Sequence, residues 1–180
     1  VHVNGRELDI LAETDTTVVH NPMSNMGNAV GATPVIGMLA RGIRLGMGTD
    51  AYTHDMFESV KVSKILQSYR LSDPTVGFGQ ALQLQFDNNP AICAKHFKRP
   101  LGMLKPGAYA DIITLDYAPF TPFGANNWRG HILFGCYGRM TNDVIINGKV
   151  VMKDRAILTV DVEKINARTE ARAAEVWKNL

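Results

Sequence analysis

Two polar clusters directly follow apolar segments in the first third of the sequence. His20 and Asn21 come after the β-branched run Thr16–Val19. Asp50 comes after the apolar run Ile43–Met47 and a short Gly-Thr turn. An imidazole or a carboxylate held at the end of a rigid strand can accept and deliver a proton, and a carboxylate can also bind a metal ion. Asp50 is the first candidate, because the turn brings its carboxylate out at the end of a buried strand.

Each candidate also has an ordinary structural explanation. Aspartate after a glycine turn often only closes the turn or caps a helix, and His20 could equally be a hydrogen-bonded histidine of the core. His54 lies in the loop after Asp50 and could reach the same edge, while His2 lies at the very start of the chain. We keep Asp50 as the catalytic candidate, and His20, Asn21, His54 and His2 as candidates for contacting a substrate.

The elements expected around these residues are βα units. A short helix over Arg6–Glu13 precedes the first strand, and a loop over Asn21–Ala32 is followed by a helix that begins at Pro34 and ends near Gly42. Asp55 is placed to cap a long helix that runs to Arg70. The predicted apolar stripe of that helix is Val62, Ile65, Leu66 and Tyr69. Strand, helix, strand and helix within so short a stretch imply a parallel sheet, whose carboxyl-terminal edge would gather the candidates.

The second half of the chain changes in character. Residues 72–99 predict more helix, with Asn89 as a cap and Pro90 in the first turn of a segment that runs to Phe97. Beyond Pro100 we expect antiparallel β-structure without helices. Its strands are Ala110–Leu115, His131–Phe134 and a hairpin of Asp143–Ile146 with Val150–Lys153 around Asn147-Gly148. A last helix over Asp161–Leu180 should pack a stripe of Val162, Ile165 and Val176 on one of the two parts.

Composition excludes several classes of function. The chain has 180 residues, 46% of them hydrophobic, and a formal net charge of +2. So small a charge argues against a nucleic-acid or membrane-surface partner. The two cysteines, Cys93 and Cys136, have no metal-binding spacing, which favours free thiols in a reducing compartment, although a single disulfide stays open. We expect a cytoplasmic protein.

Three motifs together resemble one family. His20-Asn21-Pro22-Met23-Ser24-Asn25 with Gly31 and Pro34, followed by Gly46–Asp50, is similar to the seventh and eighth strands of the amidohydrolase superfamily. The nearest branch is that of the deaminases and chlorohydrolases. Within this branch, the motifs resemble those of the SsnA-type aminohydrolases. Asn89-Pro90-Ala91 with Leu101–Ile112 resembles the passage from barrel to β-sandwich in that branch, and Asp143–Val151 resembles its closing hairpin.

The resemblance implies one divalent metal ion, zinc or alternatively iron, at the mouth of a TIM barrel. Members of the family bind it through a His-x-His on the first strand, a histidine on the fifth and the aspartate of the eighth. Only the aspartate has a counterpart here, and it is Asp50. A bound divalent ion lowers the pKa of its water to about 7, and the aspartate can move the water's proton to the leaving amine. The catalytic histidine of the sixth strand would lie just before Val1, so that His2 neighbours the site.

The resemblance also implies how the chain is divided. Residues 1–102 would be the last strands and helices of a (β/α)8 metal-dependent hydrolase barrel, 103–158 a small antiparallel β-sandwich, and 159–180 a C-terminal helix. A whole barrel needs about 250 residues, and Val1–Val3 looks like the tail of a strand. We therefore expect the C-terminal fragment of an aminohydrolase that hydrolyses a C–N bond of a nucleobase-like or other nitrogenous small molecule. The fragment should be inactive without its N-terminal part and either oligomeric or associated with that part. The alternative is a non-catalytic α/β binding module or a degenerate relative.

Overall fold

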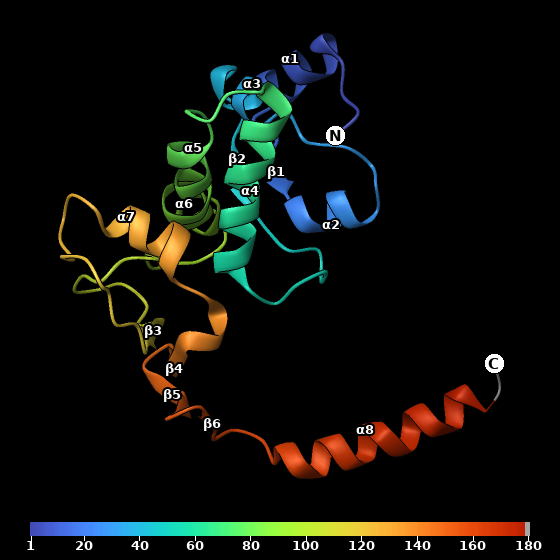
Figure 1. Ribbon diagram of the computed structural model, residues 1–180, viewed down its shortest axis with the longest axis vertical. Coiled ribbons are helices and arrows are strands. Elements are labelled where there is room, and N and C mark those ends of the chain that lie inside the picture. The colour runs from blue at the N-terminus through green and yellow to red at the C-terminus, as the bar shows by residue number, and fades with distance from the viewer. Residues whose placement is uncertain (179–180) are drawn as a thin grey trace. The chain divides into compact units, whose positions relative to one another are not determined.

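The computed structural model describes residues 1–178, which form two compact units (Figure 1). The first unit holds Val1–Ala108 and Tyr117–Met140. The second holds Tyr109–Asp116 and the described residues from Thr141 onward. The units are therefore interleaved along the chain, whereas the sequence suggested one boundary between residues 102 and 103.

The centre of the first unit is a pair of parallel strands, β1 (Val18–His20) and β2 (Leu45–Met47). Val18 lies opposite Leu45, and His20 lies opposite Met47. The predicted parallel pairing is thus confirmed, although both strands are shorter than expected. The first strand is only partly buried: the Val19 side chain is 52% exposed, while the neighbouring His20 is fully buried.

Helices surround this strand pair. The first, α1 (Gly5–Glu13), is confirmed, and Asn4 caps it through reciprocal hydrogen bonds with Glu7. The loop expected after β1 contains a short helix, α2 (Pro22–Gly27), because Pro22 fixes a helical φ at the first position. Next, α3 (Val35–Ala40) ends where Gly42 adopts a φ of +74°, as predicted. Val1–Val3 forms no strand.

The long helix α4 (Met56–Leu71) begins at Asp55, whose carboxylate accepts hydrogen bonds from Phe57 N at 2.9 Å and Glu58 N at 3.2 Å. The predicted cap is confirmed, but the predicted apolar stripe is wrong, since Tyr69 is 84% exposed. The side that faces α2 and α5 is instead narrow and rich in small polar residues. Its buried members are Ser59, Val60, Ser63, Leu66 and Gln67.

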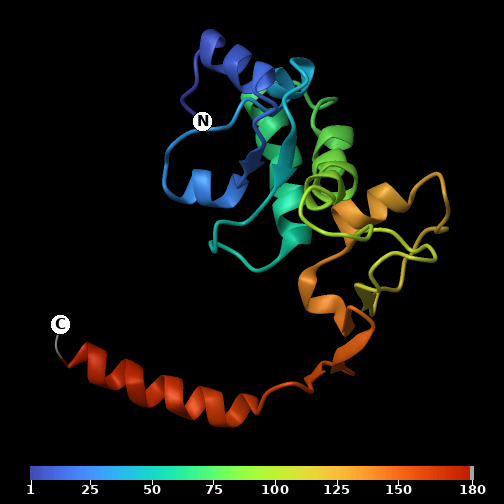
Figure 2. The same cartoon turned by 180° about the vertical axis from the view of Figure 1, so that it is seen from behind.

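One continuous helical segment follows, made of α5 (Phe78–Gln83), the π-helix η1 (Leu84–Asn88) and α6 (Asn89–Cys93). Figure 2 shows this segment and α4 beside the strand pair, as does Figure 1. The prediction that residues 72–99 contain helix is confirmed. The prediction that Asn89 caps a helix is wrong, because its side chain bonds to β2.

The predicted strand His131–Phe134 is also wrong. Those residues begin the π-helix η2 (His131–Gly135), which continues from α7 (Trp128–Gly130) and is followed by a 3-10 turn, η3 (Gly138–Met140). Leu133 is fully buried in the core, and Phe134 packs on Phe78 with ring centroids 6.2 Å apart. An apolar run as short as Ile132–Phe134 fits a buried helical turn as well as a strand, and here the segment packs against α4 as a helix.

The core of the first unit lies around β2 and joins side chains from most of its helices. Its buried members are Leu8, Val35, Met38, Ile43, Leu45, Met47, Val60, Ala81, Leu82, Leu84 and Leu133. Cys136 is also buried, and both cysteines are free thiols. The strand that leads to Asp50 is therefore anchored in this core.

The second unit is an antiparallel sheet of β3 (Ile112–Leu115), β4 (Thr141–Ile146), β5 (Lys149–Lys153) and β6 (Ala156–Ile157), in that order. The predicted hairpin is confirmed. Its turn residues Asn147 and Gly148 both have positive φ, 49° and 79°, as a two-residue hairpin loop requires.

The helix α8 (Val162–Trp177) begins at Asp161, which accepts a hydrogen bond from Lys164 N at 2.9 Å. The expectation that its apolar stripe packs on a neighbouring part is wrong, because Val162, Ile165 and Val176 are all exposed. Leu180, the last residue of the predicted helix, lies outside the described residues. Among residues 1–178 no helix is both long and apolar enough to cross a membrane.

Candidate functional site

Asp50 stands in a strained turn at the carboxyl-terminal end of β2. Its φ is 50° and that of Ala51 is 53°, so two successive residues with side chains adopt the left-handed conformation. Aspartate tolerates this conformation better than most residues, whereas alanine pays a steric cost. The Asp50 side chain is exposed. Strained backbone of this kind is concentrated at functional positions, where the surrounding structure holds it in place.

One oxygen of the Asp50 carboxylate is held by α2. Ser24 Oγ donates a hydrogen bond of 2.7 Å to Asp50 Oδ2. Ser24 is buried, and Asn28 Nδ2 donates to both Ser24 Oγ at 3.2 Å and Ser24 O at 3.0 Å. Since the Ser24 hydroxyl proton is directed at Asp50, this network orients the carboxylate. Within residues 1–178, Asp50 Oδ1 has no hydrogen-bond partner in the protein.

Two glycines allow the loops at this edge to close together. A Cβ at Gly48 would lie 2.5 Å from Asn21 Oδ1, so only glycine leaves room for the Asn21 amide beside β2. A side chain at Gly27 would collide with the ring of Tyr52, which therefore rests on the end of α2. The Asn21 side chain, which follows β1, thus contacts the backbone just after β2. Tyr52, in the loop after Asp50, contacts α2.

His20 belongs to the interior, not to the exposed edge. Its ring is fully buried, and neither Nδ1 nor Nε2 has a hydrogen-bond partner among the described residues. Burial, together with a smaller effect of the charged Val1 amino group, lowers the pKa of His20 to about 4. The ring is therefore neutral at physiological pH. The structure thus places His20 in the core, where the described residues do not supply the hydrogen bond expected of a structural histidine.

The two other candidate histidines are exposed. His2 lies beside the loop after α2, where a Cβ at Gly31 would be 3.9 Å from His2 Cε1. His54 immediately precedes the Asp55 cap of α4. Asp55 itself is fully engaged in the structure, because its Oδ2 also accepts a hydrogen bond of 2.7 Å from Gly138 N. That leaves Asp50 as the carboxylate free to act at this edge.

Metal binding by this edge would need further ligands. Within residues 1–178 no group of three or more His, Cys, Asp or Glu side chains is arranged to hold a metal ion. Asp50 nevertheless fits the part of a single ligand, because Ser24 fixes one of its oxygens and leaves the other open. An oriented carboxylate with an open oxygen is a donor that zinc accepts.

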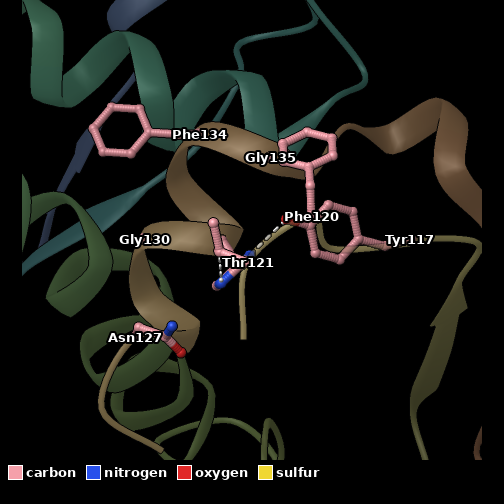
Figure 3. Close-up of a pocket in the computed structure, with 8 residues that line it drawn as sticks. Tyr117, Phe120, Thr121, Asn127, Gly130, Phe134 and Gly135 are labelled. Carbon is pink, nitrogen blue, oxygen red and sulfur yellow. Dashed lines mark hydrogen bonds between the residues drawn. The ribbon is translucent and has the colours of Figure 1, made fainter. Parts of the chain in front are cut away.

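A separate pocket of about 360 Å³ lies between the 117–127 loop and η2 (Figure 3). Tyr117 and Phe120 line it from the loop, and Phe134 lines it from η2. His131 Nδ1 and the Tyr117 hydroxyl lie 2.6 Å apart in this wall. None of the site candidates predicted from the sequence lines the pocket, and its walls are mainly aromatic and contain no carboxylate.

Sequence reasoning missed Ser24 and Asn28 as members of the site. Ser24 lies three positions after Asn21, one helical turn from the end of β1, and that spacing is the signal that could have identified it. The sequence also assigned Asn89 to a cap, whereas it bonds to the strand that leads to Asp50.

The model of the amidohydrolase family matches residues 1–151. The chain belongs to this family. It is 33% identical over 184 residues to 5-methylthioadenosine/S-adenosylhomocysteine deaminase of Desulforudis audaxviator, a match that covers 100% of the chain and 43% of that relative. It is also 33% identical to 5'-deoxyadenosine deaminase of Methanocaldococcus jannaschii, covering 94% of the chain and 40% of that relative. The chain therefore spans about two fifths of the length of these members.

Solved structures of the family share the fold. An adenosine deaminase from Xanthomonas campestris with bound zinc superposes with a TM-score of 0.84 at 21% identity, over 98% of this chain and 41% of that one. An atrazine chlorohydrolase from Arthrobacter aurescens complexed with zinc gives a TM-score of 0.73 at 20% identity, over 95% of this chain and 39% of that one. At such identities the agreement concerns the fold, which is that of amidohydrolases with a small antiparallel sheet.

Proposed function

We propose that this chain is the C-terminal part of a metal-dependent aminohydrolase that removes an amino group from a nucleobase-like or nucleoside-like small molecule. Residues 1–102 would supply the last strands and helices of its (β/α)8 barrel, 103–158 its β-sandwich and 159–180 its final helix. The observation that carries the proposal is Asp50 itself. It follows a buried parallel strand in a strained turn, with one oxygen oriented by Ser24 and the other open.

The proposed chemistry divides between the metal and this chain. A divalent ion, zinc by preference, would supply a hydrolytic water activated at neutral pH. Asp50 would be one ligand through its carboxylate, and the same carboxylate would move a proton from the attacking water to the departing amine. Asn21 lies beside the same strand end, and His54 and His2 are exposed, so these three are proposed to face the substrate.

The substrate class comes from the relatives. Both of the curated relatives named above are deaminases of adenosine derivatives modified at the 5' position. The amino group that such enzymes release sits on an aromatic ring carbon, and its departure as ammonia requires a proton. Asp50 is the group of this chain that is exposed, ionisable and oriented at the edge where the substrate would bind.

The test is Asp50→Asn in the intact protein, which keeps the size of the side chain and removes its basicity. Zinc content should fall, and release of ammonia from S-adenosylhomocysteine or 5'-deoxyadenosine should drop by roughly 10²–10⁴-fold. Asp55→Asn is the matched control, because the same chemical change falls on a carboxylate engaged by backbone N–H groups. Unchanged zinc content and turnover in Asp50→Asn would favour the alternative, a non-catalytic binding module.

A further inference from the structure

The outer edge of β2 is occupied by side chains instead of a strand. On the inner edge, Val18 N donates to Arg44 O and Gly48 N donates to His20 O, each at 2.9 Å. Successive residues of a strand direct their backbone groups to alternate edges, so Leu45 and Met47 direct theirs away from β1. There, Asn88 Nδ2 donates a hydrogen bond of 2.7 Å to Leu45 O.

Asn89 bonds to both backbone groups of Met47. Asn89 Oδ1 accepts a hydrogen bond from Met47 N at 3.0 Å, and Asn89 Nδ2 donates to Met47 O at 3.0 Å. A primary amide carries the same donor and acceptor as a peptide group, so Asn89 supplies what the backbone of an adjacent strand would supply. Asn89 Nδ2 also donates to Gln85 Oε1 at 3.1 Å, which is consistent with this orientation of the amide.

The local sequence is suited to this contact. Pro90 has no N–H to continue an α-helix, and the preceding turn widens into the π-helix η1, in which Asn89 N bonds to Leu84 O. Gly46 lets the helix approach the strand, because a Cβ there would lie 2.6 Å from Asn89 Oδ1 and 2.7 Å from Ile92 Cδ1. A π-turn, a proline and a glycine therefore combine to place one amide on one residue of β2.

We propose that Asn89 is a positioning residue for Asp50, a role that rests on the proposed function of that carboxylate. Met47 lies opposite His20 of β1, but both of its own backbone groups bond to Asn89 on the outer edge. Only Gly48 and Thr49 separate it from Asp50. Asn89 thus fixes the end of β2 from which the strained turn starts, and with it the place where the Asp50 carboxylate meets Ser24.

Asn88 provides a control within the same structure. It is also an asparagine of this helical segment that bonds to the outer edge of β2, but its contact at Leu45 lies two residues further from Asp50. Losing Asn88 removes a hydrogen bond from the edge without releasing Met47. A role of Asn89 in general stability would be shared by Asn88, whereas a role in positioning Asp50 would not.

The experiment compares Asn89→Ala with Asn88→Ala in the intact protein. Amide hydrogen exchange at Met47 should accelerate in Asn89→Ala only. In the same variant kcat should fall by roughly 10–100-fold, because a small displacement of a reacting group costs that much, with a smaller change in KM. Zinc affinity, measured by competition with a chelator, should weaken in parallel. Asn88→Ala should keep kcat and zinc affinity near those of the unchanged protein.

The proposal is overturned if Asn89→Ala leaves exchange at Met47 unchanged, or if both variants lower kcat and zinc affinity equally. If Asn89→Ala does not fold, Asn89→Asp is judged by kcat and zinc affinity alone, since it keeps the acceptor for Met47 N and loses the donors to Met47 O and Gln85 Oε1. Failure of the proposed function would be seen separately in Asp50→Asn, whereas exchange at Met47 reports on Asn89 whatever the protein catalyses.

Discussion

Ser24 Oγ donates a 2.7 Å hydrogen bond to Asp50 Oδ2 and so joins the first turn of α2 to the loop after β2. The donor is buried and is itself held by Asn28, while the acceptor is exposed. The orientation of the carboxylate is therefore set from within the protein. A ligand held this way meets a metal ion with little loss of side-chain freedom, which makes Ser24 part of the proposed site.

Ser24→Ala should weaken zinc binding or turnover of the intact protein by about 10–100-fold, the usual cost of losing a group that orients a metal ligand. Chelator competition and ammonia release measure the two effects. Ser63→Ala is the matched control, because Ser63 is equally buried but its hydroxyl has no partner among the described residues. Equal effects of the two substitutions would show that Ser24 contributes only to packing.

Asp55→Ala should lower the free energy of unfolding by about 1–2 kcal/mol, because it leaves the first turn of α4 without its cap. It also removes the acceptor for Gly138 N. Chemical denaturation measures the change. Asp161→Ala removes the same kind of cap from α8, which buries no residue, and should change the unfolding midpoint little. A larger loss in Asp161→Ala would contradict the view that α8 adds little to stability.

The chain of 180 residues should self-associate in isolation. Among the described residues β1 pairs only with β2, and Val19 is half exposed on this two-stranded sheet. An open strand edge beside apolar surface favours pairing with another chain. Light scattering at micromolar concentration should show species larger than a monomer, and Val19→Lys should reduce them. A monodisperse monomer of the unchanged chain would instead indicate a self-contained module.

Local signals predicted much of this fold. The turn at Asn147-Gly148 and the Asp55 cap were found because each needs only a few adjacent residues. Asp50 was placed at a strand end by the same kind of reasoning. The errors arose where long-range contacts decided the outcome. His131–Phe134 became helix by packing against α4, and Asn89 turned to β2, because only the folded chain brings that strand edge within reach.

The alternation of buried and exposed residues was harder to predict than the elements themselves. Ile65 and Tyr69 have helical spacing with Val62, yet both are exposed, and the buried side of α4 is formed largely by serine and glutamine. Gln67 can be buried because its Nε2 donates to Thr33 O at 3.0 Å. Apolar periodicity does not reveal a polar side chain whose partner lies more than thirty residues away.

The stability of the chain should depend on pH through His20. Burial lowers the pKa of this imidazole to about 4 in the folded state, against 6.5 for an unperturbed histidine. Above pH 6.5 the ring is neutral in both states, so it contributes no pH dependence. Between these two pKa values the unfolded chain binds a proton that the folded chain does not. The free energy of unfolding should therefore fall as the pH is lowered through this window, by about 1.4 kcal/mol per pH unit.

Chemical denaturation of the unchanged chain and of His20→Gln, at several pH values across that window, isolates this contribution. Glutamine does not titrate, so the difference in unfolding free energy between the two proteins should narrow or reverse as the pH falls. His54→Gln is the control, because it makes the same substitution at an exposed histidine. Parallel curves for the unchanged chain and His20→Gln would mean that His20 takes up its proton in the folded state as readily as in the unfolded one, and that its burial is not maintained in solution.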